Sequence, residues 1–456
     1  RPPETAPRRR RGGAAVVIAR AALAALFLCG ACLSDLERPA SDGGSDDGGV
    51  TDDGGPDRGR QFPDGVAIRR HHVTADLDGD GATDVVLLDG GDDLGVYVVL
   101  GGGPDPFLTR YHSFFDTGDC DPVAVTARDF MDDAADDLLV MCHTETQGHL
   151  LAFAGNGDGT FDEPRDHSTG GFIPDGGTVD APEAIFLTTA RLRTGSAAIG
   201  AVFGKPNESV YAYLPGDWAE EDGQPQAEVL GAAGDWTTPN AAIAVPGTFA
   251  GLDDIVVVEE GRTQWARRDD DSDLSFVVGT AETFDTAEPR FVAFAAVSED
   301  DYPDAVTGGA SGLLHVVSLT GQEEAELLQF DAGTPVEWSP DSNDDLLVLD
   351  LGASARPELV LIDATPLTNG YTLWLLDDLL VGEGGTFRGA SGTGVDLATL
   401  PVDDGRPNRI VGGNFDGQED AELWVFDAAL DLRVCFHACD AGAGLALFAC
   451  TAPCGE

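Results

Sequence analysis

The sequence predicts an all-β protein built from a repeated unit of short strands, and three observations support this prediction. Glycine and proline are abundant, with 59 and 26 residues among 456, which is typical of short elements joined by turns. A unit of apolar strand, Asp/Gly loop, acidic residue and apolar strand recurs along the chain. No amphipathic pattern of helical length lies inside a unit, which disfavours a βαβ or helical repeat.

Seven copies of this unit align on the acidic residue that ends the loop. The aligned position is occupied by Asp84, Asp137, Ile199, Asp254, Asp304, Glu358 and Glu422, in steps of 50 to 64 residues. Each repeat has room for about four strands, and four-stranded units repeated radially are the blades of a β-propeller. We therefore predict a seven-bladed β-propeller of four-stranded blades over residues 61–432. We expect residues 61–68 to supply the last strand of the seventh repeat, because an open sheet edge must be paired.

Residues 1–32 have the order of an export signal. The basic cluster Arg8–Arg11 precedes a mostly apolar run, Ala14–Leu28, and small residues follow. The apolar run is shorter than the ~20 residues that a membrane-spanning helix needs. Gly30-Ala31-Cys32 resembles a lipobox, which makes Cys32 a candidate lipidation site; ordinary signal cleavage and a tethering helix are the alternatives. We expect an extracytoplasmic protein, either a periplasmic or outer-surface lipoprotein or a secreted one.

Residues 33–60 are rich in Asp and Gly and predict a disordered linker, because they offer little to bury. The whole chain carries 81 acidic and 26 basic residues, a formal net charge of −55. Nucleic acids and anionic membranes are recognised by basic patches, so this composition argues against both as partners. Membrane contact is expected only through an N-terminal lipid anchor, and the natural small partners are cations.

Six further cysteines fit an oxidising compartment. Cys120 and Cys142 flank a predicted hairpin and can face each other across two strands. The other four form a C-x3-C-x10-C-x3-C pattern in a predicted tail, residues 433–456, and are Cys435, Cys439, Cys450 and Cys454. Two disulfides of undetermined pairing are favoured there over a zinc site, because zinc sites usually have tighter cysteine pairs.

The loop Asp76–Asp84, with the sequence DLDGDGATD, predicts a calcium site. Calcium takes about 6–8 oxygen ligands, which closely spaced carboxylates supply. Positions one, three, five and nine of the loop are carboxylates: Asp76, Asp78, Asp80 and Asp84. Position seven, Ala82, can offer its backbone carbonyl, and Gly81 at position six permits a sharp turn.

The corresponding loops of other repeats keep fewer of these oxygens. The last repeat offers a second candidate site made of Asn414, Asp416, Gln418, Asp420 and Glu422. The second and fifth repeats offer weaker ones, made of Asp129, Asp133 and Asp137 and of Ser298, Asp300 and Asp304. Met131 replaces the position-three acid in the second repeat, and Ala296 the position-one acid in the fifth. The remaining repeats have lost the ligands.

The DxDxDGxxD loop and the GNGDGTF turn at Gly155–Phe161 resemble FG-GAP/VCBS repeats, found in integrin α-subunit propellers and in bacterial surface and secreted proteins. The resemblance covers roughly residues 65–430. It implies a seven-bladed propeller with calcium in some blades, and adhesion or ligand binding more often than catalysis. The chain has no GxSxG, P-loop or HExxH motif.

We therefore predict a surface-anchored, calcium-stabilised module that binds a protein or a glycan. The alternatives are a hydrolase or lyase with its site in a central channel, and a purely structural envelope protein. Six tryptophans are expected mainly between blades, with stacking on sugars as the alternative: Trp218, Trp236, Trp265, Trp338, Trp374 and Trp424. His71 and His72 are adjacent on a predicted strand and point to opposite faces, so they are poorly placed to chelate one metal ion.

Overall fold

The computed structural model consists, over its described residues, of strands and turns without a helix. All of these residues belong to one compact unit, Gly55–Ala398 and Val402–Glu456. They are residues 60–63, 66–91, 93–102, 110–131, 133–144, 148–167, 186–193, 199–204, 210–214, 226–230, 239–247, 249, 251–259, 262–268, 276–278, 282–283, 289–295, 304–309, 314–319, 325–329, 345–349, 358–363, 372–376, 380–382, 386–388, 393–396, 409–417, 421–426, 432–440 and 445–449. The predicted signal with Cys32, and the linker up to residue 59, lie outside them. In the part of the chain that is described, no helix has the length and apolar character of a membrane span.

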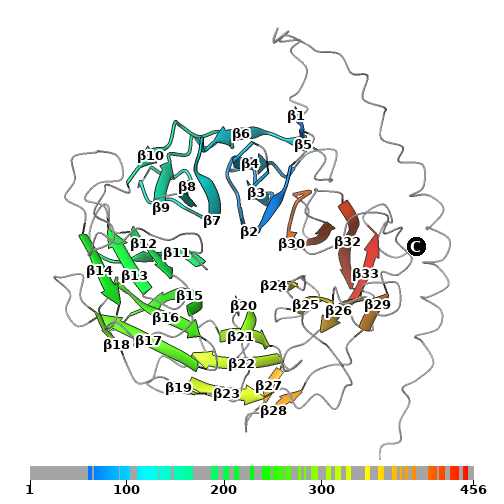
Figure 1. The fold of residues 1–456 in the computed structure, drawn as a ribbon. Helices are drawn as coiled ribbons and strands as arrows, with labels where there is room; N and C mark the ends of the chain where they lie inside the picture. The colour runs from blue at the N-terminus through cyan, green and yellow to red at the C-terminus, as the bar shows by residue number, and fades with distance from the viewer. Residues whose placement is uncertain are drawn as a thin grey trace, which may run out of the picture. The chain divides into compact units, whose positions relative to one another are not determined.

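The strands form small antiparallel sheets that follow one another along the chain (Figure 1). The first sheet contains β2 (Ile68–Ala75), β3 (Asp84–Asp89), β4 (Gly95–Val99) and β6 (Ser113–Asp116). The second sheet contains β7 (Asp121–Arg128), β8 (Asp137–His143), β9 (Gly148–Phe153) and β10 (Arg165–Asp166). The third sheet contains β11 (Phe186–Arg191), β12 (Ile199–Gly204), β13 (Val210–Leu214) and β14 (Gln226–Leu230).

The later sheets repeat this plan. The fourth sheet contains β15 (Pro239–Pro246), β16 (Asp253–Glu259), β17 (Arg262–Arg268), β18 (Phe276–Val278) and β19 (Glu282–Thr283), which also pairs with β17. The fifth contains β20 (Pro289–Ala295), β21 (Asp304–Gly309), β22 (Leu314–Leu319) and β23 (Ala325–Gln329). The sixth contains β24 (Asp345–Leu349), β25 (Glu358–Asp363), β26 (Thr372–Leu376) and β29 (Thr393–Asp396). The last contains β30 (Arg409–Gly413), β31 (Glu422–Phe426), β32 (Leu432–Asp440) and β33 (Leu445–Ala449). Two separate pairs are β1 (Arg60–Gln61) with β5 (Arg110–Tyr111), and β27 (Leu380–Gly382) with β28 (Thr386–Arg388).

One repeat of the sequence corresponds to one of these larger sheets. The aligned acidic position is the first residue of the second strand in the first, second, fifth, sixth and last sheets, and so is Ile199 in the third. In the fourth sheet Asp254 is the second residue of β16. The Asp/Gly loop of each repeat therefore joins the first strand of its sheet to the second.

The second strands of the first four sheets are packed on both faces, because apolar clusters lie on either side of them. Every residue of β3, β12 and β31 is buried. Val86 and Leu88 of the first sheet share one cluster with Leu138 and Val140 of the second. Burial on both faces explains why these strands read as continuous apolar runs rather than as alternating apolar and polar residues.

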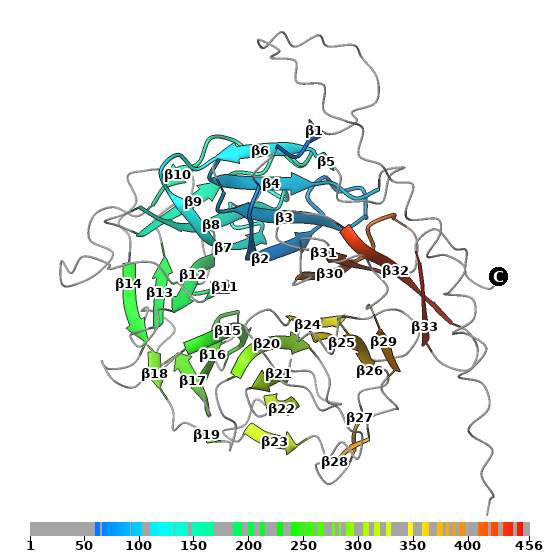
Figure 2. The ribbon, with the colours of Figure 1, turned by 45° about the vertical axis from the view of Figure 1, so that its right-hand side comes forward.

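The first and last sheets are in contact although they lie at opposite ends of the repeat region. β2 contacts β30, and the two sheets lie side by side (Figures 1 and 2). They share a buried cluster made of Ile68, Val85, Leu87, Tyr97, Val99, Val411, Phe415, Trp424 and Phe426. The same apolar packing that joins consecutive sheets thus also joins the first sheet to the last.

The last sheet is completed differently from our expectation. None of the described residues between 61 and 68 pairs with it: Arg60 and Gln61 pair with β5, and Ile68 already belongs to β2. β32 and β33 supply its third and fourth strands instead, so the boundary predicted at residue 432 falls at the start of β32. Phe62 and Val66 still contribute, since both pack against the cluster between the first and last sheets.

Candidate metal-binding loop

The loop Asp76–Asp84 connects β2 to β3 and is anchored by buried apolar residues. Leu77 and Ala82 are each only 2% exposed, whereas Asp76 and Asp80 are exposed and Asp78 is half-buried. Two turns in the loop require a left-handed backbone, and glycine supplies both, since Gly79 has φ +74° and Gly81 φ +86°. The two left-handed glycines and the two buried anchors together fix the backbone path of the loop.

Hydrogen bonds from the loop's own backbone orient three of its carboxylates. Asp78 Oδ1 accepts from the Asp80 N–H at 3.1 Å, and Asp80 Oδ1 accepts from the Ala82 N–H at 2.7 Å. Asp76 Oδ2 accepts from the Gly81 N–H at 3.1 Å. The first two are Asx-type turns, in which an aspartate side chain accepts from the N–H two residues further on.

Asp84 is a fully buried carboxylate that ties the loop to the rest of the first sheet. Its Oδ2 accepts from the Leu77 N–H at 2.6 Å, and its Oδ1 accepts from the Gly101 N–H at 2.8 Å, beyond β4. Burial raises the pKa of Asp84 from 3.8 to about 7, against the two backbone hydrogen bonds, which lower it. Each carboxylate oxygen keeps a second lone pair, so this anchoring role leaves room for a ligand.

The carboxylates of Asp76, Asp78 and Asp84 converge. One oxygen of each lies within 4.8 Å of the others. Two oxygens bound to one calcium ion at about 2.4 Å can be at most about 4.8 Å apart, so this cluster has the size of a single cation site. Desolvation, followed by the charges of Asp80 and Asp76, raises the pKa of Asp78, which is the direction a cation would reverse.

The cluster leaves the roles of two predicted ligands, Asp80 and Ala82, as predictions. Asp80 is not a member of the cluster, and its carboxylate serves the Ala82 N–H instead. Ala82 is buried in the loop, and the use of its carbonyl as a ligand stays a prediction. The all-oxygen donor set of Asp76, Asp78 and Asp84 fits a hard cation such as calcium.

The loop of the second repeat keeps the position-nine acid that accepts backbone N–H groups, but its described acids do not converge. Asp137 accepts from the N–H groups of Phe130, Met131 and Gly155 at 3.0, 2.9 and 2.9 Å. Asp129 accepts from the N–H groups of Asp133 and Ala134, at 3.2 and 3.1 Å. Among the described residues, the acids of this loop form no group of three within 4.8 Å.

The last repeat has a partly described loop with the same anchor. Glu422 is 2% exposed, and its Oε2 accepts from the Phe415 N–H at 2.6 Å. Desolvation raises the pKa of Glu422 to about 7, and the charge of Asp416 adds to this. The Oδ1 atom of Asn414 is buried without a hydrogen-bond partner.

Several predicted ligands lie outside the described residues: Gln418 and Asp420 of the last repeat, and Ser298 and Asp300 of the fifth. In the fifth repeat Asp304 is fully buried at the start of β21.

Contacts between neighbouring loops were not predicted from the sequence. The Asn414 N–H donates to Thr83 Oγ1 at 3.0 Å, and the Thr83 N–H donates to the Asn414 carbonyl at 2.6 Å. The third and fourth sheets make an equivalent contact, in which the Arg191 N–H donates to Asp253 Oδ2 at 2.7 Å. In both cases position one of one loop bonds to position eight of the next. Position eight is Thr, Asp, Ala or Pro in the different repeats, so the sequence holds no recurrent signal for this contact.

Comparisons with known proteins identify no family. No protein-family profile matches the chain, and no curated protein matches it either. One similar solved structure is BBS1N in complex with ARL6DN, soaked with lead, at 14% identity and a TM-score of 0.48 over 81% of this chain and 92% of that one. A mercury-soaked form of that complex has 14% identity and a TM-score of 0.45 over 80% and 90%. An Agrocybe aegerita lectin, described as recognising non-reducing terminal N-acetylglucosamine, has 15% identity and a TM-score of 0.44 over 79% and 87%. Likenesses at these values support no inference about ligand or activity.

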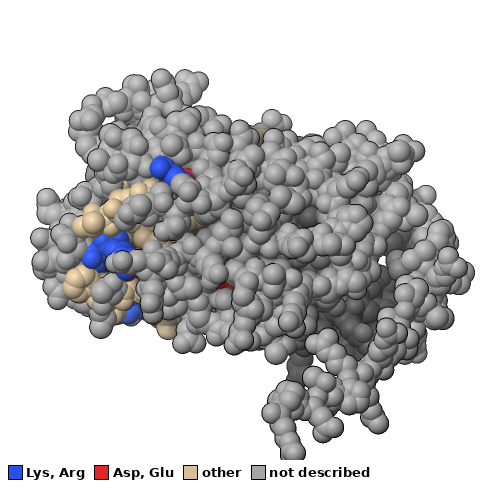
Figure 3. Space-filling view, turned by 90° about the horizontal axis from the view of Figure 1, so that it is seen from below, with Lys and Arg blue, Asp and Glu red and all other residues tan. Residues whose placement is uncertain are grey.

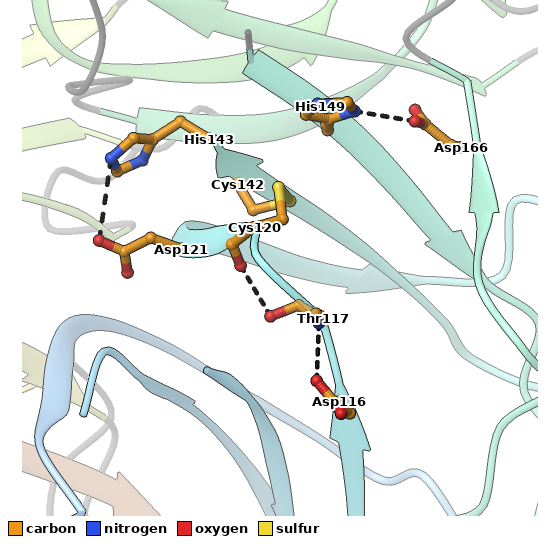
Figure 4. The surroundings of a disulfide bond; sticks show 9 residues. Asp116, Thr117, Cys120, Asp121, Cys142, His143, His149 and Asp166 are labelled. Atoms are coloured by element: carbon orange, nitrogen blue, oxygen red, sulfur yellow. Dashed lines mark hydrogen bonds and ion pairs between the residues drawn. A yellow bond between two sulfur atoms is a disulfide. The ribbon is translucent and has the colours of Figure 1, made fainter. Parts of the chain in front are cut away.

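Cys120 and Cys142 form a disulfide in the second sheet (Figure 4). Both are buried, and the bond ties the residue before β7 to β8. Asp121 follows Cys120, and its Oδ1 accepts a hydrogen bond from Arg69 Nη2 of the first sheet at 2.6 Å. The other oxygen, Oδ2, lies 3.8 Å from His143 Nε2. Cys435 and Cys439 lie on β32, whereas Cys450 and Cys454 are outside the described residues, so neither disulfides nor zinc can be assigned there.

Of the remaining candidates, two tryptophans have described side chains, and both are buried. Trp265 and Trp424 are 7% and 2% exposed and belong to the clusters between sheets, as expected for packing residues. Trp374 lies on β26, and Trp218, Trp236 and Trp338 lie outside the described residues. His71 and His72 are both half-buried on β2.

Proposed function

We propose that this chain is an exported, calcium-stabilised β-propeller of the FG-GAP/VCBS type that serves as a binding or adhesion module for a protein or a glycan. In this proposal each of the larger sheets is one of seven four-stranded blades. The proposal is supported by the order of contacts between sheets. The first strands contact one another in chain order, from β2 to β7, β11, β15, β20, β24 and β30, and β30 contacts β2.

The observation that carries the calcium proposal is the convergence of Asp76, Asp78 and Asp84 within 4.8 Å. Three carboxylates at that spacing repel one another, and a divalent cation would offset the repulsion. Asp76, Asp78 and Asp84 would hold the ion in the first loop, and Asn414, Asp416 and Glu422 would contribute to a second site in the last. A bound cation would supply charge neutralisation at both loops.

Calcium would brace the contact between the first and last sheets. The first loop reaches Asn414 through Thr83, and the Gly102 N–H donates to the Phe415 carbonyl at 2.7 Å. Both candidate loops therefore lie at the same contact. A cation that stiffens either loop would stabilise the contact that holds the two ends of the repeat region together.

A binding role is favoured over catalysis because the sites that calcium would occupy are anchors rather than reaction centres. The described acids of the loops are held by backbone amides, and the chain carries none of the common catalytic motifs. We therefore assign the three converging carboxylates a role in holding the shape of the loop, not in catalysis.

Two measurements test this proposal on the full chain. Isothermal titration of the metal-free protein with calcium should show saturable binding, with magnesium much weaker because it demands a stricter octahedral geometry. Glycan and protein arrays should then show binding that is lost in EDTA. Absence of calcium binding would refute the metal role, whereas turnover of a polysaccharide or phosphoester would refute the binding role.

A further inference from the structure

The loops of the first and last repeats lie against each other where the first sheet meets the last. Thr83, at position eight of the first loop, exchanges two hydrogen bonds with Asn414, at position one of the last loop. The Asn414 N–H donates to Thr83 Oγ1 at 3.0 Å, and the Thr83 N–H donates to the Asn414 carbonyl at 2.6 Å. Thr83 directly precedes Asp84, and Asn414 is itself a predicted ligand. A backbone shift at one candidate cation loop is therefore passed on to the other.

A second link joins the acids at position nine of the two loops. Asp84 Oδ1 accepts from the Gly101 N–H at 2.8 Å. The next residue, Gly102, donates its N–H to the Phe415 carbonyl at 2.7 Å, and the Phe415 N–H donates to Glu422 Oε2 at 2.6 Å. Three hydrogen bonds thus connect Asp84 to Glu422 along two short pieces of backbone. Both acids are buried, so water does not compete for the bonds that they accept.

The contact is packed too closely for either loop to move alone. A Cβ atom at Gly413, the residue before Asn414, would lie 2.6 Å from Thr83 Cγ2. A Cβ atom at Gly101 would lie 2.5 Å from the Thr83 carbonyl oxygen and 2.9 Å from that of Phe415. These distances are shorter than van der Waals contact, which explains why glycine occupies both positions. Closely packed segments transmit a displacement instead of absorbing it.

The last loop offers an unsatisfied oxygen at the same contact. Asn414 Oδ1 is buried and has no hydrogen-bond partner among the described residues. A buried acceptor is normally paired, and a hard cation held with Asp416 and Glu422 would satisfy it. The backbone of Asn414 is also the part of the last loop that bonds to Thr83. An ion at this residue would therefore hold the segment that contacts the first loop.

Negative charge is concentrated in the two loops that touch. The first loop brings one oxygen each of Asp76, Asp78 and Asp84 within 4.8 Å of one another, and the last loop contributes Asp416 and Glu422. On the face shown in Figure 3, by contrast, basic side chains lie among uncharged ones, and the described residues show little acidic surface there. The acids within each loop repel one another, and a cation in that loop would offset the repulsion.

The contact of the first loop with the second repeat is looser. The Gly159 N–H donates to the Leu77 carbonyl at 3.3 Å, and Ser113 Oγ donates to the Gly159 carbonyl at 2.9 Å. Asp137, the position-nine acid of the second repeat, accepts its described hydrogen bonds from its own repeat. The described hydrogen bonds thus join acid to acid at the contact between the first and last repeats, and not at this one.

We propose that the loops of the first and last repeats bind calcium cooperatively, and that the contacts Thr83–Asn414 and Gly102–Phe415, which we call the clasp, carry the coupling. This inference rests on the proposed calcium role of both loops. An ion in one loop fixes the backbone at the clasp, so less entropy is lost when the second ion orders the other loop. The ends of the repeat region are then held together over a narrower range of calcium concentration than two independent sites would give.

Calorimetric titration of the metal-free full chain with calcium tests the coupling. Two bound ions repel each other, so the titrations are made at physiological ionic strength, where salt screens charges beyond about 8 Å. Asp76→Asn with Asp78→Asn silences the first loop, and Asp416→Asn with Glu422→Gln silences the last. Each amide keeps an oxygen for a backbone N–H, and each variant gives the affinity of one loop alone. The product of the two association constants of the wild type should exceed the product of these single-loop constants by about 5-fold or more.

Substitution at the clasp should remove this coupling factor. Thr83→Val removes the hydroxyl that accepts from Asn414 and keeps the shape of the side chain, so the factor should fall to about 1. Ser113→Ala is the matched control, because it removes a hydroxyl that bonds across the contact with the second repeat. It should leave the factor unchanged, and both variants should keep the wild-type circular dichroism spectrum.

Hydrogen exchange gives a second measurement without a change at the clasp. In the Asp416→Asn with Glu422→Gln variant only the first loop can bind calcium. Calcium should still slow the exchange of the Asn414 and Phe415 N–H groups in the last loop, by about 5-fold.

The outcomes separate this inference from the proposed function. Two ions bound with a coupling factor of about 1, or a Thr83→Val factor equal to that of the wild type, would overturn the clasp and leave the calcium role intact. A single bound ion would overturn it in the same way. If the chain bound no calcium at all, the proposed calcium role would fail and the clasp with it.

Discussion

The loops of the first and second repeats share one backbone plan but differ in how their carboxylates are used. In both, the acid at position nine accepts the N–H of the buried apolar residue at position two, Leu77 or Phe130. In both, position six has a left-handed backbone, at Gly81 with φ +86° and at Ala134 with φ +74°. The two loops differ in the residue at position three, which is Asp78 in the first and Met131 in the second.

The difference shows that the shape of the loop does not depend on a metal site. In the second loop the Met131 N–H adds a third hydrogen bond to Asp137, and the backbone satisfies the acids. In the first loop three carboxylates converge, and two of them have a raised pKa through burial and mutual repulsion. Position nine is thus an anchor in every well-described loop, and position three decides whether the anchor also becomes part of a cation site.

The largest effect is expected from removing the anchors. Asp84→Ala leaves the N–H groups of Leu77 and Gly101 unpaired, and Asp137→Ala leaves those of Phe130, Met131 and Gly155 unpaired. Each variant should lose about 2–5 kcal/mol of unfolding free energy in EDTA, measured by urea denaturation. Only Asp84→Ala should also lose the stabilisation by calcium. If Asp137→Ala lost it as well, the proposed distinction between the loops would be wrong.

The next effect separates the metal site from the anchor. Asp78→Asn removes one converging carboxylate while keeping an oxygen for the Asp80 N–H, so it should weaken calcium binding at least 10-fold in a calorimetric titration. The stability in EDTA should stay the same or rise, since repulsion is relieved. Asp133→Asn in the second loop is the matched control and should leave calcium binding unchanged. Equal effects of the two substitutions would contradict the assignment.

The buried acids should have a moderate effect on how the melting temperature depends on pH. The folded-state pKa values of Asp84 and Glu422 are raised to about 7, above the ordinary values of 3.8 and 4.5. The folded chain therefore holds protons that the unfolded chain releases, and this stabilisation is present below about pH 4 and is lost as the pH rises through 7. In EDTA the melting temperature should fall over that interval, and calcium should offset the fall increasingly toward pH 7. Asp84→Asn should flatten the curve; an unchanged slope would show that Asp84 does not titrate there.

The smallest effect is a gain of function. Met131→Asp restores an acid at position three of the second loop and should add one calcium site, measured as an increase of one in the calorimetric stoichiometry. We expect at least 10-fold weaker affinity than at the first loop, because the described acids of the second loop do not converge as those of the first do. Met131→Asn, without the charge, is the control. A stoichiometry that does not change would mean that the backbone of this loop cannot open toward an ion.

The sequence was informative wherever the decisive contacts are local. The loop lengths and the acid at position nine located the start of the second strands, and the spacing of Cys120 and Cys142 matched their disulfide. The role of Asp80 as a ligand stays a prediction, since its carboxylate lies outside the cluster of Asp76, Asp78 and Asp84. The contacts of Thr83 and Asp253 with other repeats depend on three-dimensional packing, which no local pattern encodes. The predicted propeller ended at residue 432, before the last two strands of this sheet, because the cysteines of β32 suggested a separate tail. The sequence of β32, LRVCFHACD, nevertheless has the alternation of apolar and polar residues that a strand can show.

The hydrogen bond between Asn414 and Thr83 joins residues 331 positions apart, and this has a consequence for biosynthesis. A contact of such long range forms late, because the loop-closure entropy is offset only when the last strands have been made. Until then the first sheet must present Val85 and Leu87 without their partners Val411 and Phe426. A nascent chain in that state can pair with the finished last sheet of a neighbour as easily as with its own. A low concentration of unfinished chains would limit such exchange between neighbouring molecules.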